Sequence, residues 1–133
     1  MPSVLKAVAR ADPYSEIEFV EWSYGDWRPF EGQAIVWFTP ETGGGVGLFA
    51  IGMVRSDAAD AGRNAKGNRL VSFTAAFTRF NPREPLKKQH FRSLPRIGAG
   101  SPMQFLNRCL YINSHAKVAE IDAATFGFLE SRF

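Results

Sequence analysis

The residue types best suited to contact phosphate gather in one segment of the chain, residues 79–96. Its sequence, RFNPREPLKKQHFRSLPR, holds a single acidic residue, Glu84. Against this residue stand six basic ones, Arg79, Arg83, Lys87, Lys88, Arg92 and Arg96. Such a run is typical either of a solvated helix face or of a patch that faces the phosphates of a nucleic acid. The charges alone leave both interpretations open.

Aromatic side chains gather in a second segment, EWSYGDW, residues 21–27, which holds two tryptophans and a tyrosine. Large rings of this kind commonly pack in a core, and Trp22 could do so with Tyr24 as its cap. Trp27 lies beside Asp26 and is a less obvious core residue. Trp37 stands in the middle of an apolar run, where a core position is the more common outcome. The segment therefore offers either core rings or the walls of an aromatic site.

Catalytic and metal-binding arrangements are weakly represented in the sequence. His90, His115 and Cys109 do not stand at the spacings that zinc sites use. Ser114 beside His115 lacks the surroundings of a nucleophile elbow. The acidic residues are scattered singly, whereas a metal-dependent nuclease needs them clustered. We therefore expect no catalytic residue, no metal and no cofactor.

Length and composition are those of a folded domain. The chain has 133 residues, 45% of them hydrophobic and 22% charged, with a formal net charge of +3. This length is enough to bury a core, so we expect one domain over residues 1–133. A single cysteine cannot form an internal disulfide, which favours a reducing compartment. Without an apolar run of about 18 residues or a signal-peptide pattern, we expect a cytoplasmic protein with no membrane partner.

Strand patterns occupy the middle of the chain and helix patterns its end. We expect strands at residues 3–11, at Gln33–Thr39, at residues 46–55, at Leu70–Phe80 and at Leu110–Ile112, and a short strand or helical turn that ends at Trp22. The apolar runs around PETGGG suit a hairpin, and Ser56–Asn68 reads as a mobile loop. We expect helices within residues 83–94 and 101–106 and from Ala123 onward, capped by Asp122. These elements predict an α+β fold, a small curved β-sheet or barrel flanked by helices.

Several of these segments resemble EVE domains and their relatives the YTH domains, members of the PUA-like group. The central GQAIVWFTPETGGGVGLFAIGMVRSD, followed by a polar loop and LVSFTAAFTRFNPREPLKKQHF, is similar to the middle of those domains. LKAVARADPYSEIE is similar to their opening and VAEIDAATFGFL to their close. The resemblance implies a PUA-like fold with an aromatic pocket that takes a modified base out of DNA or RNA. A flipped base can regain its stacking energy between aromatic rings.

The resemblance also implies which residues line such a pocket. Trp22 matches the wall of the YTH cage and Ser23 the group that hydrogen-bonds the base. The other base-binding candidates that this placement gives are Tyr24, Trp27, Trp37, Thr39 and Pro40. Relatives contact the nucleic-acid backbone from the segment before the last strand, where this chain has Ser101, Asn107 and Arg108. The basic run adds Arg79, Lys87, Lys88, Arg92 and Arg96.

Three functions stay open on these grounds. The first is a non-enzymatic reader of a modified base, such as a methylated cytosine or adenine. Its expected partners are DNA or RNA and a nuclease encoded nearby. The second is a small metal-independent ribonuclease, as the related ASCH domains imply. The third is a β-rich module whose aromatic residues bind another protein.

Overall fold

The strands of the computed structural model form one sheet, which carries a single helix on one side among the described residues. The structure describes residues 2–8, 10, 12–23, 28–41, 44–84, 86–87, 89, 106 and 117–133. Within them the elements are β1 Ser3–Lys6, β2 Ile17–Trp22, β3 Ala34–Thr39, β4 Gly47–Val54, β5 Ala59–Arg63, β6 Arg69–Phe80, β7 Val118–Glu120 and α3 Ala123–Glu130.

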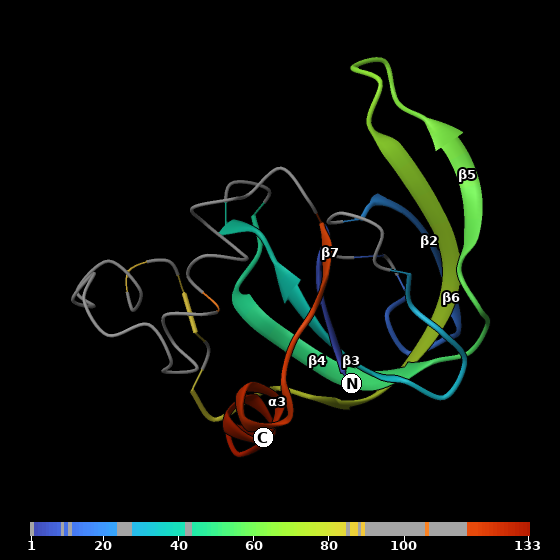
Figure 1. The fold of residues 1–133 in the computed structure, drawn as a ribbon. Coiled ribbons are helices and arrows are strands. Elements are labelled where there is room, and N and C mark those ends of the chain that lie inside the picture. The colour runs from blue at the N-terminus through green and yellow to red at the C-terminus, as the bar shows by residue number, and fades with distance from the viewer. Residues whose placement is uncertain are drawn as a thin grey trace.

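The sheet is strongly curled (Figure 1). Its strand order is β2-β6-β4-β3-β1-β7, and β5 pairs with β6 outside this path. The β1–β3 pair is parallel, while the other named pairs are antiparallel. The edges meet where Ser23 forms a bridge with Val118 and the Lys117 amide donates to the Trp22 carbonyl at 2.7 Å. We call this contact the seam.

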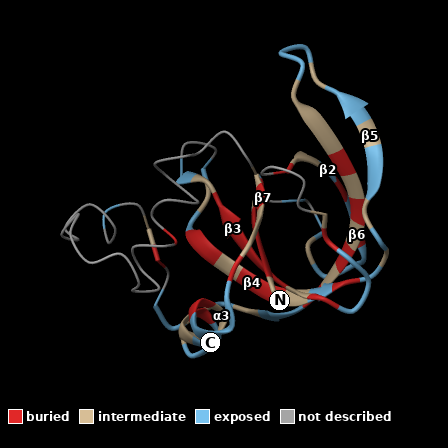
Figure 2. Cartoon of the chain, viewed as in Figure 1, coloured by how far each residue is buried: buried red, intermediate tan, exposed pale blue. Residues whose placement is uncertain are grey.

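Aromatic rings fill the inside of the curl. Phe19 packs with its ring centroid 5.4 Å from that of Trp37 and 5.6 Å from that of Phe73. Along β6 the buried residues alternate with less buried ones, from Val71 to Phe77, as the sequence predicted. Figure 2 shows the resulting red bands across the sheet. The interior is therefore a packed core, as small curled sheets require.

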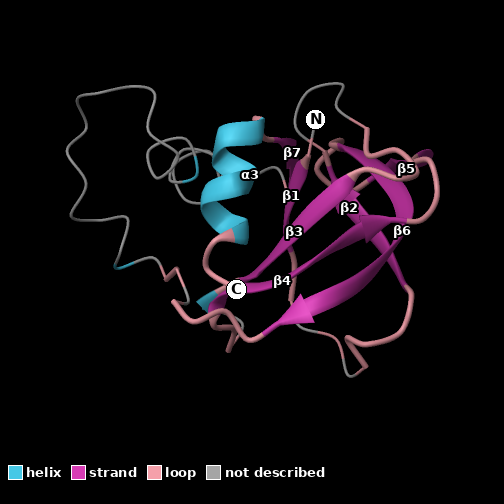
Figure 3. Ribbon diagram, turned by 90° about the horizontal axis from the view of Figure 1, so that it is seen from below, coloured by secondary structure: helices cyan, strands magenta, loops and turns pink. Residues whose placement is uncertain are grey.

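A second core lies between the outer face of the sheet and α3 (Figure 3). The helix begins after Asp122, whose carboxylate accepts a hydrogen bond from the Thr125 amide at 2.7 Å, so the predicted cap is confirmed. Leu129 is fully buried there, and Phe126 and Phe133 pack beside it. None of the described helical residues forms a helix long and apolar enough to cross a lipid bilayer.

Several expectations about individual elements need correction. The segment Ser56–Asn68 is not merely a loop, because it contains β5, which pairs with β6. The first strand ends at Lys6 and does not run to residue 11. The predicted helices at 83–94 and 101–106 lie mostly outside the described residues, and the predicted strand Leu110–Ile112 lies outside them. Helix α3 is the one helix whose whole range the structure describes. The hairpin around PETGGG is confirmed as the antiparallel β3–β4 pair.

Candidate functional site

A pocket of about 280 Å³ opens beside the seam. It is lined by Lys6, Ala7, Val8, Arg10, Glu21, Pro40 and Lys117, and we call it the rim pocket. These residues come from the end of β1 and the residues after it, the end of β2, the residue after β3 and the residue before β7. Because the interior of the curl is filled, the rim pocket lies at its mouth, where the backbone strands end and side chains of four segments converge.

Glu21 points toward the interior side of the sheet. Along β2, Ile17 and Phe19 are buried in the inner core and Glu21 is the next residue of the same face, because successive side chains alternate between faces. Its partner across the strand pair is the buried Val71. Burial raises the pKa of the Glu21 carboxyl, and the positive charges of Arg10 and Lys117 partly offset that rise.

Positive side chains share the pocket with this carboxyl. The guanidinium carbon of Arg10 lies 5.1 Å from the centroid of the Phe19 ring, over the core that Glu21 adjoins. Lys6 and Lys117 are joined through their backbones, since the Lys6 amide donates to the Lys117 carbonyl at 2.8 Å. Three cationic side chains thus line the pocket against one carboxyl. Such a set attracts an anion and still offers a hydrogen-bond acceptor.

Of the predicted base-binding residues that the structure describes, only Pro40 is part of this pocket. Thr39 is buried, with its hydroxyl accepting from the Val46 amide at 2.9 Å, so it holds the β3–β4 turn. Ser23 is buried at the seam. Trp22 is half-buried and lies on the face of β2 opposite Glu21, paired with Leu70.

Trp37 is not a pocket residue, contrary to its place among the base-binding candidates. Its side chain is 0% exposed in the inner core. Its indole nitrogen donates to the Ala7 carbonyl at 2.9 Å, and its ring packs against Phe19 and Phe77. The Trp37 ring therefore has no exposed face on which a base could stack. Tyr24 and Trp27 lie outside the described residues.

Of the predicted backbone contacts, the described part of the chain includes Arg79 and Lys87. The Arg79 guanidinium lies 3.5 Å from the Glu130 carboxylate and 5.7 Å from the centroid of the Phe133 ring. It therefore packs against the end of the C-terminal helix. Lys87 is half-buried. Lys88, Arg92, Arg96, Ser101, Asn107 and Arg108 lie outside the described residues.

The polar lining of the rim pocket was missed by the sequence reasoning. One signal existed for Glu21, because it occupies the apolar face in the alternation of β2. Lys6, Arg10 and Lys117 carry no comparable local signal, since they stand in separate segments that only the curl of the sheet brings together.

No protein-family model and no curated protein matches the chain. Among solved structures, the chain is similar to the NMR structure of Rpa0253 from Rhodopseudomonas palustris, with a TM-score of 0.57 and 11% sequence identity. The match covers 98% of this chain and 90% of that one. At this identity the likeness concerns the fold, a small curled β-sheet shared over nearly the full length of both chains.

Proposed function

We propose that the protein is a nucleic-acid-binding module that takes a modified base of DNA or RNA into the rim pocket. One observation supports this proposal most: three cationic side chains and the partly desolvated carboxyl of Glu21 line the same pocket at the mouth of the curled sheet. A nucleotide combines the two features that this pocket complements, an anionic phosphate and a base edge that carries hydrogen-bond donors.

Each part of the pocket has a role in this proposal. Lys6, Arg10 and Lys117 attract the phosphate next to the flipped base. The Glu21 carboxylate accepts from an amino group on the base edge, as carboxylates do from the cytosine amine. Apolar atoms of Pro40 and of its neighbours in the lining contact the base ring. The resemblance to EVE and YTH domains supports the same class of ligand.

Direct binding measurements test the proposal. A panel of short oligonucleotides, plain and carrying methylated cytosine or adenine, is titrated into the wild-type protein and into two variants. Glu21→Gln keeps the shape of the side chain but loses the acceptor charge. Glu18→Gln removes a carboxyl from the outer face of the same strand, where Glu18 is exposed and accepts from the Ser72 hydroxyl at 3.3 Å.

We expect the wild-type protein to prefer one modified base, and Glu21→Gln to lose about tenfold in affinity for it, because a charge-assisted hydrogen bond contributes about 1.5–3 kcal/mol. Glu18→Gln should bind as the wild type does. Equal affinity for every member of the panel, or equal behaviour of the two variants, would refute the proposal.

A metal-independent ribonuclease is a second candidate, and the raised pKa of Glu21 favours it. The Glu21 carboxylate could take the proton of a ribose 2′-hydroxyl, whose oxygen would then attack the adjacent phosphorus. The bond from phosphorus to the 5′-oxygen would break, that oxygen would take a proton from a lysine or from water, and a 2′,3′-cyclic phosphate would remain. Arg10 and the two lysines would stabilise the charge that develops on the phosphoryl oxygens. Incubation of RNA in the presence of a chelator, with Glu21→Gln as control, separates this activity from simple binding. Cleavage lost in the variant would support it.

A further inference from the structure

The β5–β6 hairpin extends beyond the curl of the sheet as an arm, residues 59–72 (Figure 1). Its outer strand, ADAGR, contains no large apolar residue and four of its five residues are exposed (Figure 2). The arm therefore gains little from packing against the core. Its place in the fold depends on backbone pairing with β6 and on a structured tip.

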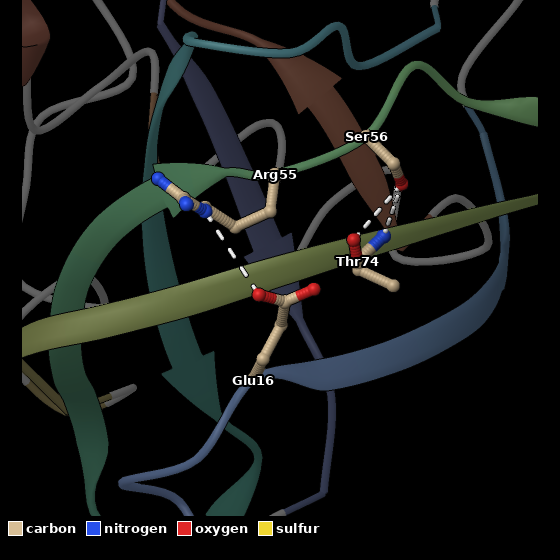
Figure 4. A network of polar contacts seen from close by, with 4 residues as sticks. All are labelled: Glu16, Arg55, Ser56 and Thr74. Atoms are coloured by element: carbon tan, nitrogen blue, oxygen red, sulfur yellow. Dashed lines mark hydrogen bonds and ion pairs between the residues drawn. The ribbon is translucent and has the colours of Figure 1, made fainter.

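The tip and the root of the arm are both held by specific hydrogen bonds. At the tip, the Asn64 side chain accepts from the amides of Lys66 at 3.0 Å and Asn68 at 2.9 Å. At the root, the Ser56 hydroxyl oxygen accepts from both the amide and the hydroxyl of Thr74, each at 2.9 Å, as Figure 4 shows. An arm fixed at both ends presents its side chains in a defined arrangement.

The outer half of the arm carries positive charge. Residues 61–69, AGRNAKGNR, include Arg63, Lys66 and Arg69 and no acidic residue. Arg63 and Arg69 stand directly opposite each other in the β5–β6 register. Like charges at directly opposed positions are destabilising. The Arg63 guanidinium donates to the Gly67 carbonyl at 2.8 Å and so lies along the tip of the arm, where a bound anion would reduce the repulsion between the two positive charges.

The positive face of the arm is on the same side of the sheet as the rim pocket. Arg69 belongs to the face of β6 that continues with the buried Val71 and Phe73. Val71 pairs with Glu21, and Leu70 pairs with Trp22 at the end of β2. Residues at the base of the arm thus pair directly with Glu21 of the pocket and with Trp22 beside the seam.

We propose that the arm is a second contact surface for the phosphate backbone, so that the ligand is a polynucleotide strand and not a free nucleotide. The strand whose base enters the rim pocket runs along the inner face of the arm, with its neighbouring phosphates between Arg63, Lys66 and Arg69. This inference rests on the proposed function of the pocket, and it adds the class of ligand and the direction in which the strand leaves the site.

The test compares binding of a modified oligonucleotide of about twelve residues with binding of the matching mononucleotide, at several salt concentrations. The arm variant is Arg63→Gln with Lys66→Gln. The matched control, Arg55→Gln with Arg83→Gln, removes two charges from other exposed positions; Arg55 lies 3.9 Å from Glu16, and Arg83 donates to the Ser131 carbonyl. Glu21→Gln serves as the pocket variant.

We expect the arm variant to bind the oligonucleotide at least tenfold more weakly and with a salt slope smaller by about 1.4, because each phosphate contact to a single strand contributes about 0.7 to the slope. Its affinity for the mononucleotide and its preference for the modified base should equal those of the wild type and of the control. Thermal unfolding checks that the arm variant is folded, because the substitution also removes the hydrogen bond that Arg63 donates to the Gly67 carbonyl.

Unchanged oligonucleotide affinity and salt slope in the arm variant would overturn the inference. If Glu21→Gln still loses the base preference in that case, the proposed function of the pocket stands without the arm. If the wild-type protein binds no oligonucleotide of the panel, the proposed function fails and the inference about the arm fails with it.

Discussion

Glu21 is the residue on which the chemistry of the rim pocket depends. Burial raises its pKa, so the folded protein binds more protons at this site than the unfolded chain does between the ordinary pKa of about 4.5 and the raised one. Its contribution to the free energy of unfolding therefore falls as the pH rises through that window. At neutral pH the ionised carboxyl is kept in the pocket at a cost to stability.

Urea denaturation at pH 4 and pH 8 measures this cost. Relative to the wild type, Glu21→Gln should gain stability on going from pH 4 to pH 8, because glutamine has no charge to desolvate. Glu18→Gln, at an exposed position of the same strand, corrects for the loss of a carboxyl as such. A relative stability of Glu21→Gln that stays constant or falls over this pH range would contradict the pocket geometry.

The sequence singled out the neighbours of Glu21, although the alternation of β2 directs Glu21 itself toward the interior. The resemblance drew attention to Trp22 and Ser23, the residues that could stack or hydrogen-bond. A strand that ends at Trp22 and buries Phe19 must direct Glu21 to the same side as Phe19. The strand and its faces were within reach of the sequence. Whether the interior would be full at Trp37 and open at Glu21 depended on how tightly the sheet curls, which no local pattern encodes.

At the scale of the elements, β4 departs from strict alternation at a bulge. Its register against β3 shifts between Trp37 and Phe38, so that Phe49 is an extra residue between the paired positions Leu48 and Ala50. As a result, Leu48 and Ile51 pack in the outer core while Ala50 and Val54 pack in the inner one. The sequence pattern assigned alternate residues to alternate faces and so placed Leu48 with Ala50, which is wrong because the register shifts add residues that break the period.

Gly52 lies at a second irregularity, where β6 carries the extra residue Thr78 opposite the step from Ile51 to Gly52. A Cβ atom there would meet the Ala76 carbonyl oxygen and would lie 2.6 Å from the Phe77 Cα, both in the backbone of β6. Gly52→Ala should therefore lower the free energy of unfolding by about 1–3 kcal/mol, the usual cost of overpacking. Gly127→Ala in α3 is the matched control, because nothing lies within 4 Å of its added Cβ. That variant should gain about 0.5–1 kcal/mol from helix propensity. Chemical denaturation of both variants measures the change in the free energy of unfolding. Equal changes would contradict the close approach of the β6 backbone to Gly52.

Helix α3 and strand β5 show which elements the sequence patterns could predict and which they could not. Helix α3 was predicted from a capping aspartate and apolar spacings of three and four, since its stability comes from a face that packs. Strand β5 was missed because it has almost no side chain to bury. It forms by pairing its backbone with the extension of β6, and turn residues such as Asn64 signalled only that the chain reverses.

At the scale of the whole molecule, the curled sheet is the level at which the similarity to Rpa0253 holds, with 11% identity over 98% of this chain. The order of the strands places β2 and β7 at opposite edges, and only their contact at Ser23 and Val118 brings the pocket residues together. Closure of this kind involves residues from the two ends of the chain. The sequence predicted a curved sheet. It did not predict which two strands meet at the seam, because that depends on the assembled sheet.

That join has a mechanical consequence. Between β2 and β7 the described backbone shows one bridge and the hydrogen bond from the Lys117 amide to the Trp22 carbonyl, whereas β2 and β6 pair over six residues. The join should be the first place to open, and the Lys117 amide should exchange with solvent faster than the amides of β3 and β4. The rim pocket takes Glu21 from one side of the join and Lys6 and Lys117 from the other. A ligand bound there would contact both sides of the seam and hold them together. Slower exchange of the Lys117 amide in the presence of the ligand would show this stabilisation.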